Sequence, residues 1–112
     1  LMVKGLPVGT KVLFGGNEIE LYEDGSAHLT STKGLAGSTL KVNMGLKVLV
    51  EKAMVPWDYA INSCTLNPAR LLGIDSRKGA IRAGNDADIV VLNDDYSVET
   101  TYARGKVVYE KQ

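Results

Sequence analysis

The sequence predicts an α+β fold, in which short strands come first, helices follow and strands return at the end of the chain. In the first and last thirds of the chain, alternating apolar residues are separated by glycine-containing turns. Between them, apolar residues recur at helical spacing behind capping residues and prolines. With 112 residues, of which 45% are hydrophobic, the chain can bury one modest core or two partial ones.

The charges and the single cysteine narrow the class of protein. Thirteen basic residues balance thirteen acidic ones without a long run of either sign, which argues against a nucleic-acid or anionic-membrane partner. The longest apolar runs, such as residues 89–92, are far shorter than the roughly 20 residues that span a membrane. Cys64 is the only cysteine, which excludes an intrachain disulfide and is typical of a cytoplasmic protein. Because the chain begins at Leu1 rather than at a methionine, we expect a piece of a longer protein.

The first elements are short strands joined by tight turns. We expect strands at residues 11–14, 18–22 and 27–29, with turns at 15–17 and 23–25. The turns contain Gly-Gly and Asp-Gly pairs, which accept positive φ at little cost. This region therefore predicts consecutive hairpins.

A helical hairpin is expected next. Ser38 is a suitable N-cap for a helix over residues 39–53, whose Leu40, Met44 and Val48 would share one face. The same stretch also alternates as a strand would, and Gly45 in a helix interior costs about 1 kcal/mol relative to alanine. We favour the helix for its cap and its length. Pro56 then fits the first position of a second helix, whose apolar face would be formed by Trp57, Ala60, Ile61 and Cys64.

The rest of the chain predicts one short helix and then strands. Asn67 would cap this helix, Pro68 would open it and Gly73 would close it, the usual arrangement of proline at the start and glycine past the end. After Gly73 we expect strands at Ile81 and at residues 89–92, 98–102 and 106–109, with turns at 78–79, 93–95 and 104–105.

Several of these motifs occur together, in this order, in a known family. The sequence resembles the C-terminal part of the N-acetylglucosamine-6-phosphate deacetylase family of the amidohydrolase superfamily. The motifs that carry the resemblance are Lys4-Gly5-Leu6-Pro7, Leu35-Ala36-Gly37-Ser38-Thr39-Leu40, the run from Asn67 to Gly73 and the run from Lys78 to Leu92. The last of these is common to many amidohydrolases, whereas Leu35-Ala36-Gly37-Ser38 points to the deacetylases.

The resemblance implies a fold and a reaction. Residues 1–73 would form the end of a (β/α)8 metal-dependent hydrolase barrel, and residues 74–112 would form the C-terminal strands of a small β-sandwich domain. The family hydrolyses the N-acetyl amide of an amino-sugar phosphate with a divalent metal ion and a catalytic aspartate. By the resemblance, the metal ligands and that aspartate lie upstream of Leu1, and His28 is the only histidine here. We therefore expect no catalytic residue, no metal site and no activity in this chain alone.

The resemblance also implies one functional segment. Leu35, Ala36 and Gly37 match the loop with which the family contacts its substrate. A glycine-containing loop lets backbone groups approach a sugar, and a helix beginning behind Ser38 would add free N–H donors. The expected partners are the amino-sugar phosphate in the parent enzyme and further copies of the chain. We expect Asp86 and Asp88 to have a hydrogen-bonding rather than a catalytic role.

Two other functions remain open at this point. The chain could be a non-catalytic α+β module that binds a partner or oligomerises. It could also be a fragment of another amidohydrolase, dihydroorotase-like or aminoacylase-like, because the motif from Lys78 to Leu92 is shared among them.

Overall fold

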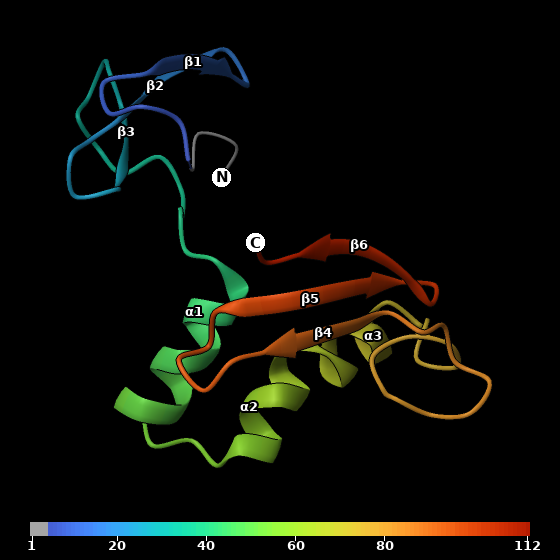
Figure 1. Cartoon of the computed structure of the whole chain (residues 1–112). Coiled ribbons are helices and arrows are strands. Elements are labelled where there is room, and N and C mark those ends of the chain that lie inside the picture. The colour runs from blue at the N-terminus through green and yellow to red at the C-terminus, as the bar shows by residue number, and fades with distance from the viewer. Residues whose placement is uncertain (1–4) are drawn as a thin grey trace. The chain divides into compact units, whose positions relative to one another are not determined.

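A computed structural model describes residues 5–112, which form two compact units, one ending at Leu40 and one spanning Lys41–Gln112 (Figure 1). Lys4, the first residue of the Lys-Gly-Leu-Pro motif, lies outside the described residues. None of the helices formed by residues 5–112 is both long and apolar enough to cross a membrane.

The first unit is a three-stranded antiparallel sheet in the order β1-β2-β3. Its strands are β1 (Lys11–Phe14), β2 (Asn17–Leu21) and β3 (Ala27–Leu29). Gly15 and Gly16 in the first turn and Gly25 in the second have φ values of +55°, +81° and +80°. These are the left-handed conformations that the turn residues predicted, and both hairpins are confirmed.

The core of this unit lies on one face of its sheet. Ile19 and Leu21 alternate with exposed or half-exposed glutamates along β2, and both are buried together with Ala27 of β3. Leu21 is paired directly with Ala27 in the register of the two strands. Val12, Leu29 and Ala36 pack around this group. The two-residue period of the strands therefore builds the small core.

The second unit contains another antiparallel sheet, in the order β4-β5-β6. Its strands are β4 (Ile89–Leu92), β5 (Val98–Ala103) and β6 (Lys106–Glu110), close to the expected bounds. The strand expected at Ile81 is wrong. Ile81 is 82% exposed and belongs to no strand, and the nearby Asn85 side chain donates to the Ala80 carbonyl within an irregular segment.

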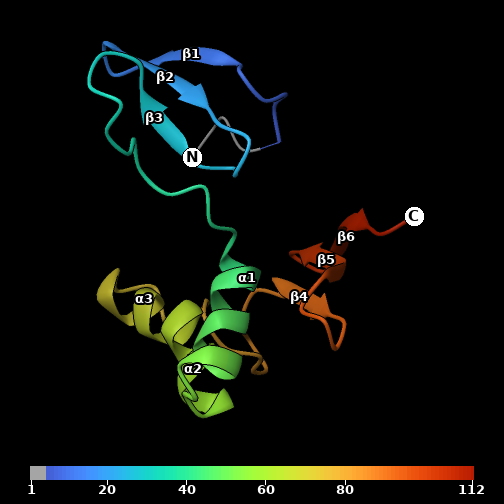
Figure 2. The same ribbon diagram turned by 90° about the vertical axis from the view of Figure 1, so that its left-hand side faces the viewer.

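Helices lie on one face of the β4-β5-β6 sheet (Figures 1 and 2). They are α1 (Val42–Lys47), a π-helical continuation η1 (Val48–Lys52), α2 (Trp57–Cys64) and α3 (Leu66–Leu71). Their buried residues are Leu46, Ala60 and Ala69. The helical interpretation of the stretch that also alternates as a strand is therefore confirmed.

The expected helix starts need correction. The first helix begins at Val42 behind Lys41, not behind Ser38, whose hydroxyl instead accepts a bond from the Leu40 N–H at 3.0 Å. Pro56 is the N-cap residue of α2 and not its first residue. The third helix begins at Leu66 behind Thr65, so Asn67 and Pro68 lie inside its first turn.

The expected end of α3 at Gly73 is confirmed. Gly73 has a φ of +67°, and its N–H donates to the Arg70 carbonyl at 3.0 Å. The Ile74 N–H donates to the Ala69 carbonyl at 2.9 Å, which completes a Schellman motif.

The boundary between the two units follows Leu40, whereas the resemblance suggested a domain boundary after Gly73. The helices belong to the same compact unit as the C-terminal strands. The Asn43 side chain of α1 donates to the Tyr96 carbonyl in the β4–β5 turn at 2.9 Å, and Trp57 of α2 contacts the Tyr96 ring at a centroid distance of 5.9 Å. The assignment of residues 1–73 to a barrel and of 74–112 to a sandwich stays a prediction.

Candidate substrate-contacting loop

The segment Leu35-Ala36-Gly37 runs along β3 in the first unit. Leu35 forms an isolated antiparallel bridge with His28, and the Ala36 N–H donates to the Ala27 carbonyl at 2.8 Å. The segment therefore extends the sheet beyond β3 for two residues. Backbone pairing, and not a helix, fixes its path.

Its three residues differ in what they present. Ala36 packs against the core of the unit, whereas the Leu35 side chain is 72% exposed. Gly37 has a φ of +88°, which side-chain-bearing residues rarely adopt. The surface that this segment offers consists of the Leu35 side chain and of the backbone around Gly37, where no Cβ is present.

The expected helical N–H donors behind this segment are not found. Residues 38–41 are neither helix nor strand, and Lys41 has an extended backbone (φ −81°, ψ 142°). A contact of residues 35–37 with a ligand would rest on their own backbone groups.

His28 has contacts that the sequence did not reveal. Its Nδ1 lies 2.7 Å from the Lys33 carbonyl oxygen, its Nε2 lies 2.8 Å from Ser26 Oγ, and its ring stacks on Tyr22 at a centroid distance of 4.3 Å. The Ser26 hydroxyl also donates to Asp24 Oδ1. No sequence pattern pointed to these contacts, because Asp24 lies in the turn before β3 and Ser26 precedes the strand, so that only His28 belongs to a strand.

This arrangement affects the acidity of Asp24. Hydrogen bonds from the Ser26 hydroxyl and the Ser26 N–H, which lies 2.8 Å from Oδ1, hold the pKa of the Asp24 carboxyl below its usual value. The charge of His28 acts in the same direction. Asp24 is thus ionised in its role as an acceptor.

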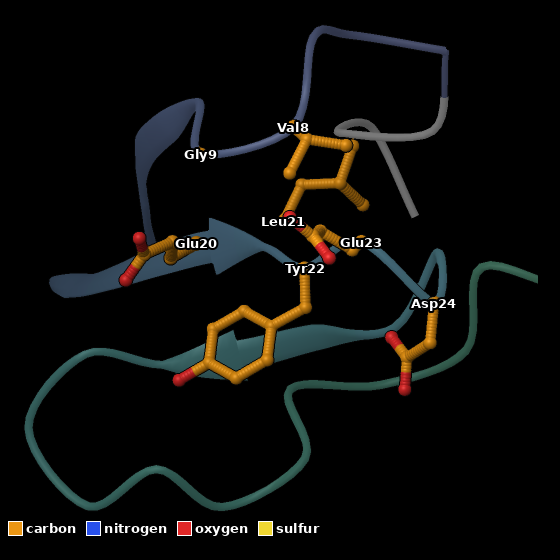
Figure 3. Close-up of a pocket in the computed structure, with 7 residues that line it drawn as sticks. All are labelled: Val8, Gly9, Glu20, Leu21, Tyr22, Glu23 and Asp24. Atoms are coloured by element: carbon orange, nitrogen blue, oxygen red, sulfur yellow. The ribbon is translucent and has the colours of Figure 1, made fainter.

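A hollow of about 460 Å³ lies beside this arrangement, because Tyr22 and Asp24 belong to its lining (Figure 3). In Figure 3 the carboxyl groups of Glu20 and Asp24 lie at opposite ends of it, and Glu23 adds a third carboxylate. Such a lining repels an anion. Residues 35–37 do not line it, and its charge does not suit a sugar phosphate.

The second unit holds a cluster of charged side chains. Lys78 Nζ pairs with Asp86 Oδ2 at 2.8 Å and with Asp88 Oδ2, and Arg77 Nη1 pairs with Asp86 Oδ2 at 2.8 Å. Asp88 also accepts the Arg104 N–H at 2.8 Å. Lys78 lowers the pKa of both carboxyls, and the two carboxylates raise the pKa of Lys78. Asp86 is thus paired with two cations, and Asp88 is paired with one cation and one backbone amide.

The residues described do not fit a catalytic metal ion. No group of three or more histidine, cysteine, aspartate or glutamate side chains within residues 5–112 is placed to hold one. Both ring nitrogens of His28, the single histidine, lie within hydrogen-bond distance of other groups. A tetrahedral site with three protein ligands cannot be assembled from these groups.

Comparison with known proteins relates the chain to one family. The model of the amidohydrolase family matches residues 16–108. The chain is 36% identical over 109 residues to an N-acetylglucosamine-6-phosphate deacetylase of Bacillus subtilis, covering 97% of the chain and 27% of that protein. It is 33% identical over 107 residues to an N-acetylgalactosamine-6-phosphate deacetylase of Escherichia coli O157:H7, covering 96% of the chain and 28% of that protein.

Solved structures give the same result. The N-acetylglucosamine-6-phosphate deacetylase of Thermotoga maritima matches with a TM-score of 0.84 and 27% identity, over 99% of this chain and 30% of that one. A mutant of the Mycobacterium smegmatis enzyme, in complex with N-acetyl-D-glucosamine-6-phosphate, matches with a TM-score of 0.75 and 30% identity, over 95% of this chain and 28% of that one. The chain thus spans less than a third of the length of each of these proteins.

Proposed function

The chain belongs to the amidohydrolase family, and we propose that it forms the C-terminal part of a deacetylase that hydrolyses N-acetylglucosamine 6-phosphate to glucosamine 6-phosphate and acetate. The observation that carries the proposal is the 36% identity to such a deacetylase over 97% of this chain. A match that runs through both units favours a piece of this enzyme over an unrelated α+β binding module. The relatives that match are deacetylases of amino-sugar phosphates, which favours a deacetylase over a dihydroorotase-like or aminoacylase-like parent.

The contribution of this chain to the reaction is binding and not bond cleavage. In the proposal, Leu35, Ala36 and Gly37 border the substrate, with the backbone at Gly37 close to the sugar. The left-handed φ of Gly37 and the 72% exposure of the Leu35 side chain support this role. Ala36 anchors the segment because its N–H and its side chain are both held by the first unit.

The metal chemistry belongs to other residues of the parent. A divalent cation in such an enzyme would polarise the amide carbonyl and activate water. The side chains described here do not form a site for it, so we assign them no step in that chemistry. We propose that the parent is cytoplasmic, in keeping with the single cysteine of this part, and that the chain by itself associates with further copies through its exposed apolar residues.

A second substrate is favoured by one observation. The 33% identity to an N-acetylgalactosamine-6-phosphate deacetylase is close to the 36% above, and the two sugars differ only in the configuration of one hydroxyl. The higher identity favours the glucose epimer as the first substrate. Release of acetate from the galactose epimer is therefore the alternative activity.

The test is acetate release by the full-length polypeptide that contains this chain. The purified protein, supplied with a divalent cation, is given N-acetylglucosamine 6-phosphate, N-acetylgalactosamine 6-phosphate and unphosphorylated N-acetylglucosamine. We expect kcat/KM to be highest for the first. A higher value for the galactose epimer would assign the alternative activity, and no release from either phosphate would overturn both.

A further inference from the structure

The His28 side chain is held on three sides. Its ring stacks on Tyr22, one nitrogen faces the Ser26 hydroxyl, and the other faces the Lys33 carbonyl oxygen at 2.7 Å. Ser26 is itself bonded to the ionised Asp24. The ring orientation is therefore fixed from both ends by polar partners and from one face by an aromatic ring.

The carbonyl that His28 contacts belongs to a residue in an unfavourable conformation. Lys33 has a φ of +59°, a conformation that costs a residue with a Cβ free energy unless its surroundings hold it. Two backbone bonds help: the Lys33 N–H donates to the Leu29 carbonyl at 2.9 Å, and the Leu29 N–H donates to the Gly34 carbonyl at 2.8 Å. Since Lys33 O is only an acceptor, its contact with Nδ1 is a bond donated by the ring.

The turn at Lys33 leads directly into the candidate substrate segment. Leu35 follows two residues later and forms its bridge with His28 itself. The ring and the backbone of one residue thus hold both the turn and the start of the segment. A change in the turn would shift Leu35, Ala36 and Gly37 relative to β3.

We propose that His28 is a positioning residue: it fixes the turn at Lys33 and thereby sets the position from which residues 35–37 contact the sugar phosphate. The inference rests on the proposed function for the contact with substrate, but not for the fixing of the turn. His28 touches no reacting atom. Its removal alters the affinity for substrate, whereas the chemical step is retained.

Two substitutions separate the contacts of the ring. His28→Phe keeps an aromatic ring that can stack on Tyr22 but removes both nitrogens. His28→Asn loses the ring but keeps an amide N–H near the position of Nδ1, from which it can donate to Lys33 O. Ser31→Ala, an exposed position in the same turn, serves as the control.

The experiment uses the full-length polypeptide and two measurements. Hydrogen exchange reports the backbone amides of Leu29 and Ala36, which are bonded to Gly34 O and Ala27 O, and steady-state kinetics with N-acetylglucosamine 6-phosphate report KM and kcat. We expect His28→Phe to speed exchange at both amides and to raise KM about five- to tenfold, the effect of about one hydrogen bond. Its kcat should stay within about twofold of the original value. In His28→Asn, both the exchange rates and KM should return most of the way to the original values. Ser31→Ala should change neither the exchange rates nor KM.

Each remaining outcome decides against the proposal in a defined way. Unchanged exchange in His28→Phe would show that the ring does not hold the turn. Faster exchange with an unchanged KM would show that the turn does not position a substrate contact. A fall in kcat as large as the rise in KM, without recovery in His28→Asn, would indicate a general loss of structure. If the original protein itself releases no acetate, the proposed function fails, and exchange alone then decides whether His28 fixes the turn.

Discussion

Gly79 lies against Ala69 of α3 so closely that a Cβ atom on Gly79 would be 2.7 Å from the Cβ of Ala69. The same atom would be 2.9 Å from the Thr65 carbonyl oxygen, and Gly79 has a φ of +82°. Space and backbone conformation both exclude a side chain at this position. The contact places the backbone next to Lys78, a member of the charged cluster, against α3.

Gly79→Ala is therefore expected to destabilise the second unit. Gly84→Ala is a matched control, because Gly84 has a φ of +90° but no heavy atom within 4 Å of an added Cβ. The backbone conformation alone should cost about 1 to 2 kcal/mol in either variant. Overpacking should cost Gly79→Ala about 1 to 3 kcal/mol more. Urea unfolding measures the free energies, and equal losses in the two variants would contradict the close contact.

The charged cluster predicts a stability that depends on pH. Asp86 and Asp88 have lowered pKa values because Lys78 bonds to them, so their contribution is present above the ordinary aspartate pKa of about 3.9 and is lost as pH falls further. Lys78 has a raised pKa, so its contribution is present below the ordinary lysine pKa of about 10.4 and is lost as pH rises further.

The measurement is the urea midpoint of the chain at pH 7 and at about pH 3. Lys78→Met should lower the midpoint at pH 7, and the difference from the original chain should shrink at the acidic pH, because pH 3 lies below the ordinary aspartate pKa and the contribution of the carboxylates declines there. Lys106→Met, on an exposed strand without a recorded ion pair, is the control. An equal effect of Lys78→Met at both pH values would show that the cluster does not act through charge.

The substrate segment predicts a kinetic effect in the full-length enzyme. Gly37→Val places a β-branched residue where φ is +88°, which displaces the backbone and crowds its approach to the sugar. We expect kcat/KM to fall by roughly five- to twentyfold, with unchanged metal content. Gly16→Val is the control, because Gly16 has a similar φ of +81° and no heavy atom within 4 Å of an added Cβ, and it lies in the β1–β2 turn outside this segment. An unchanged kcat/KM in a folded Gly37→Val enzyme would show that this segment only connects the two units.

The exposed apolar residues predict self-association of the chain when it is produced alone. Leu71 and Leu72 at the end of α3 are 88% and 70% exposed. Light scattering should give an average mass that rises with concentration. Replacing both leucines by lysine should lower the association more than replacing the exposed polar residues Asn67 and Ser76 by lysine. A monomeric mass at every concentration would contradict the prediction.

Much of the fold could be predicted because local chemistry determines it. The hairpins follow from turn residues that accept positive φ, and Gly73 ends α3 for the same reason. Ser38 misled because a serine can bond to a neighbouring amide in an extended segment as well as at a helix start, and here it bonds to the Leu40 N–H. Ile81 misled because a single apolar residue between glycines does not establish a strand.

The candidate site was located only in part. The residues of the segment 35–37 could be named from a resemblance to a family, but their attachment to the sheet could not. The contact of His28 with Lys33 depends on a left-handed backbone conformation at Lys33. Lysine rarely adopts this conformation, so the sequence did not predict it. Interactions that depend on such a turn become visible only in three dimensions.

Trp57 and Tyr96 give the second unit a spectroscopic probe of its own. Trp57 is the only tryptophan of the chain, and its ring lies 5.9 Å from that of Tyr96, between centroids. Since Tyr96 belongs to the turn that joins β4 to β5, tryptophan emission reports whether the turn stays on helix α2. The first unit contains no tryptophan and therefore contributes no tryptophan fluorescence. Melting of the helix–sheet layer can therefore be followed by fluorescence separately from events in the first unit.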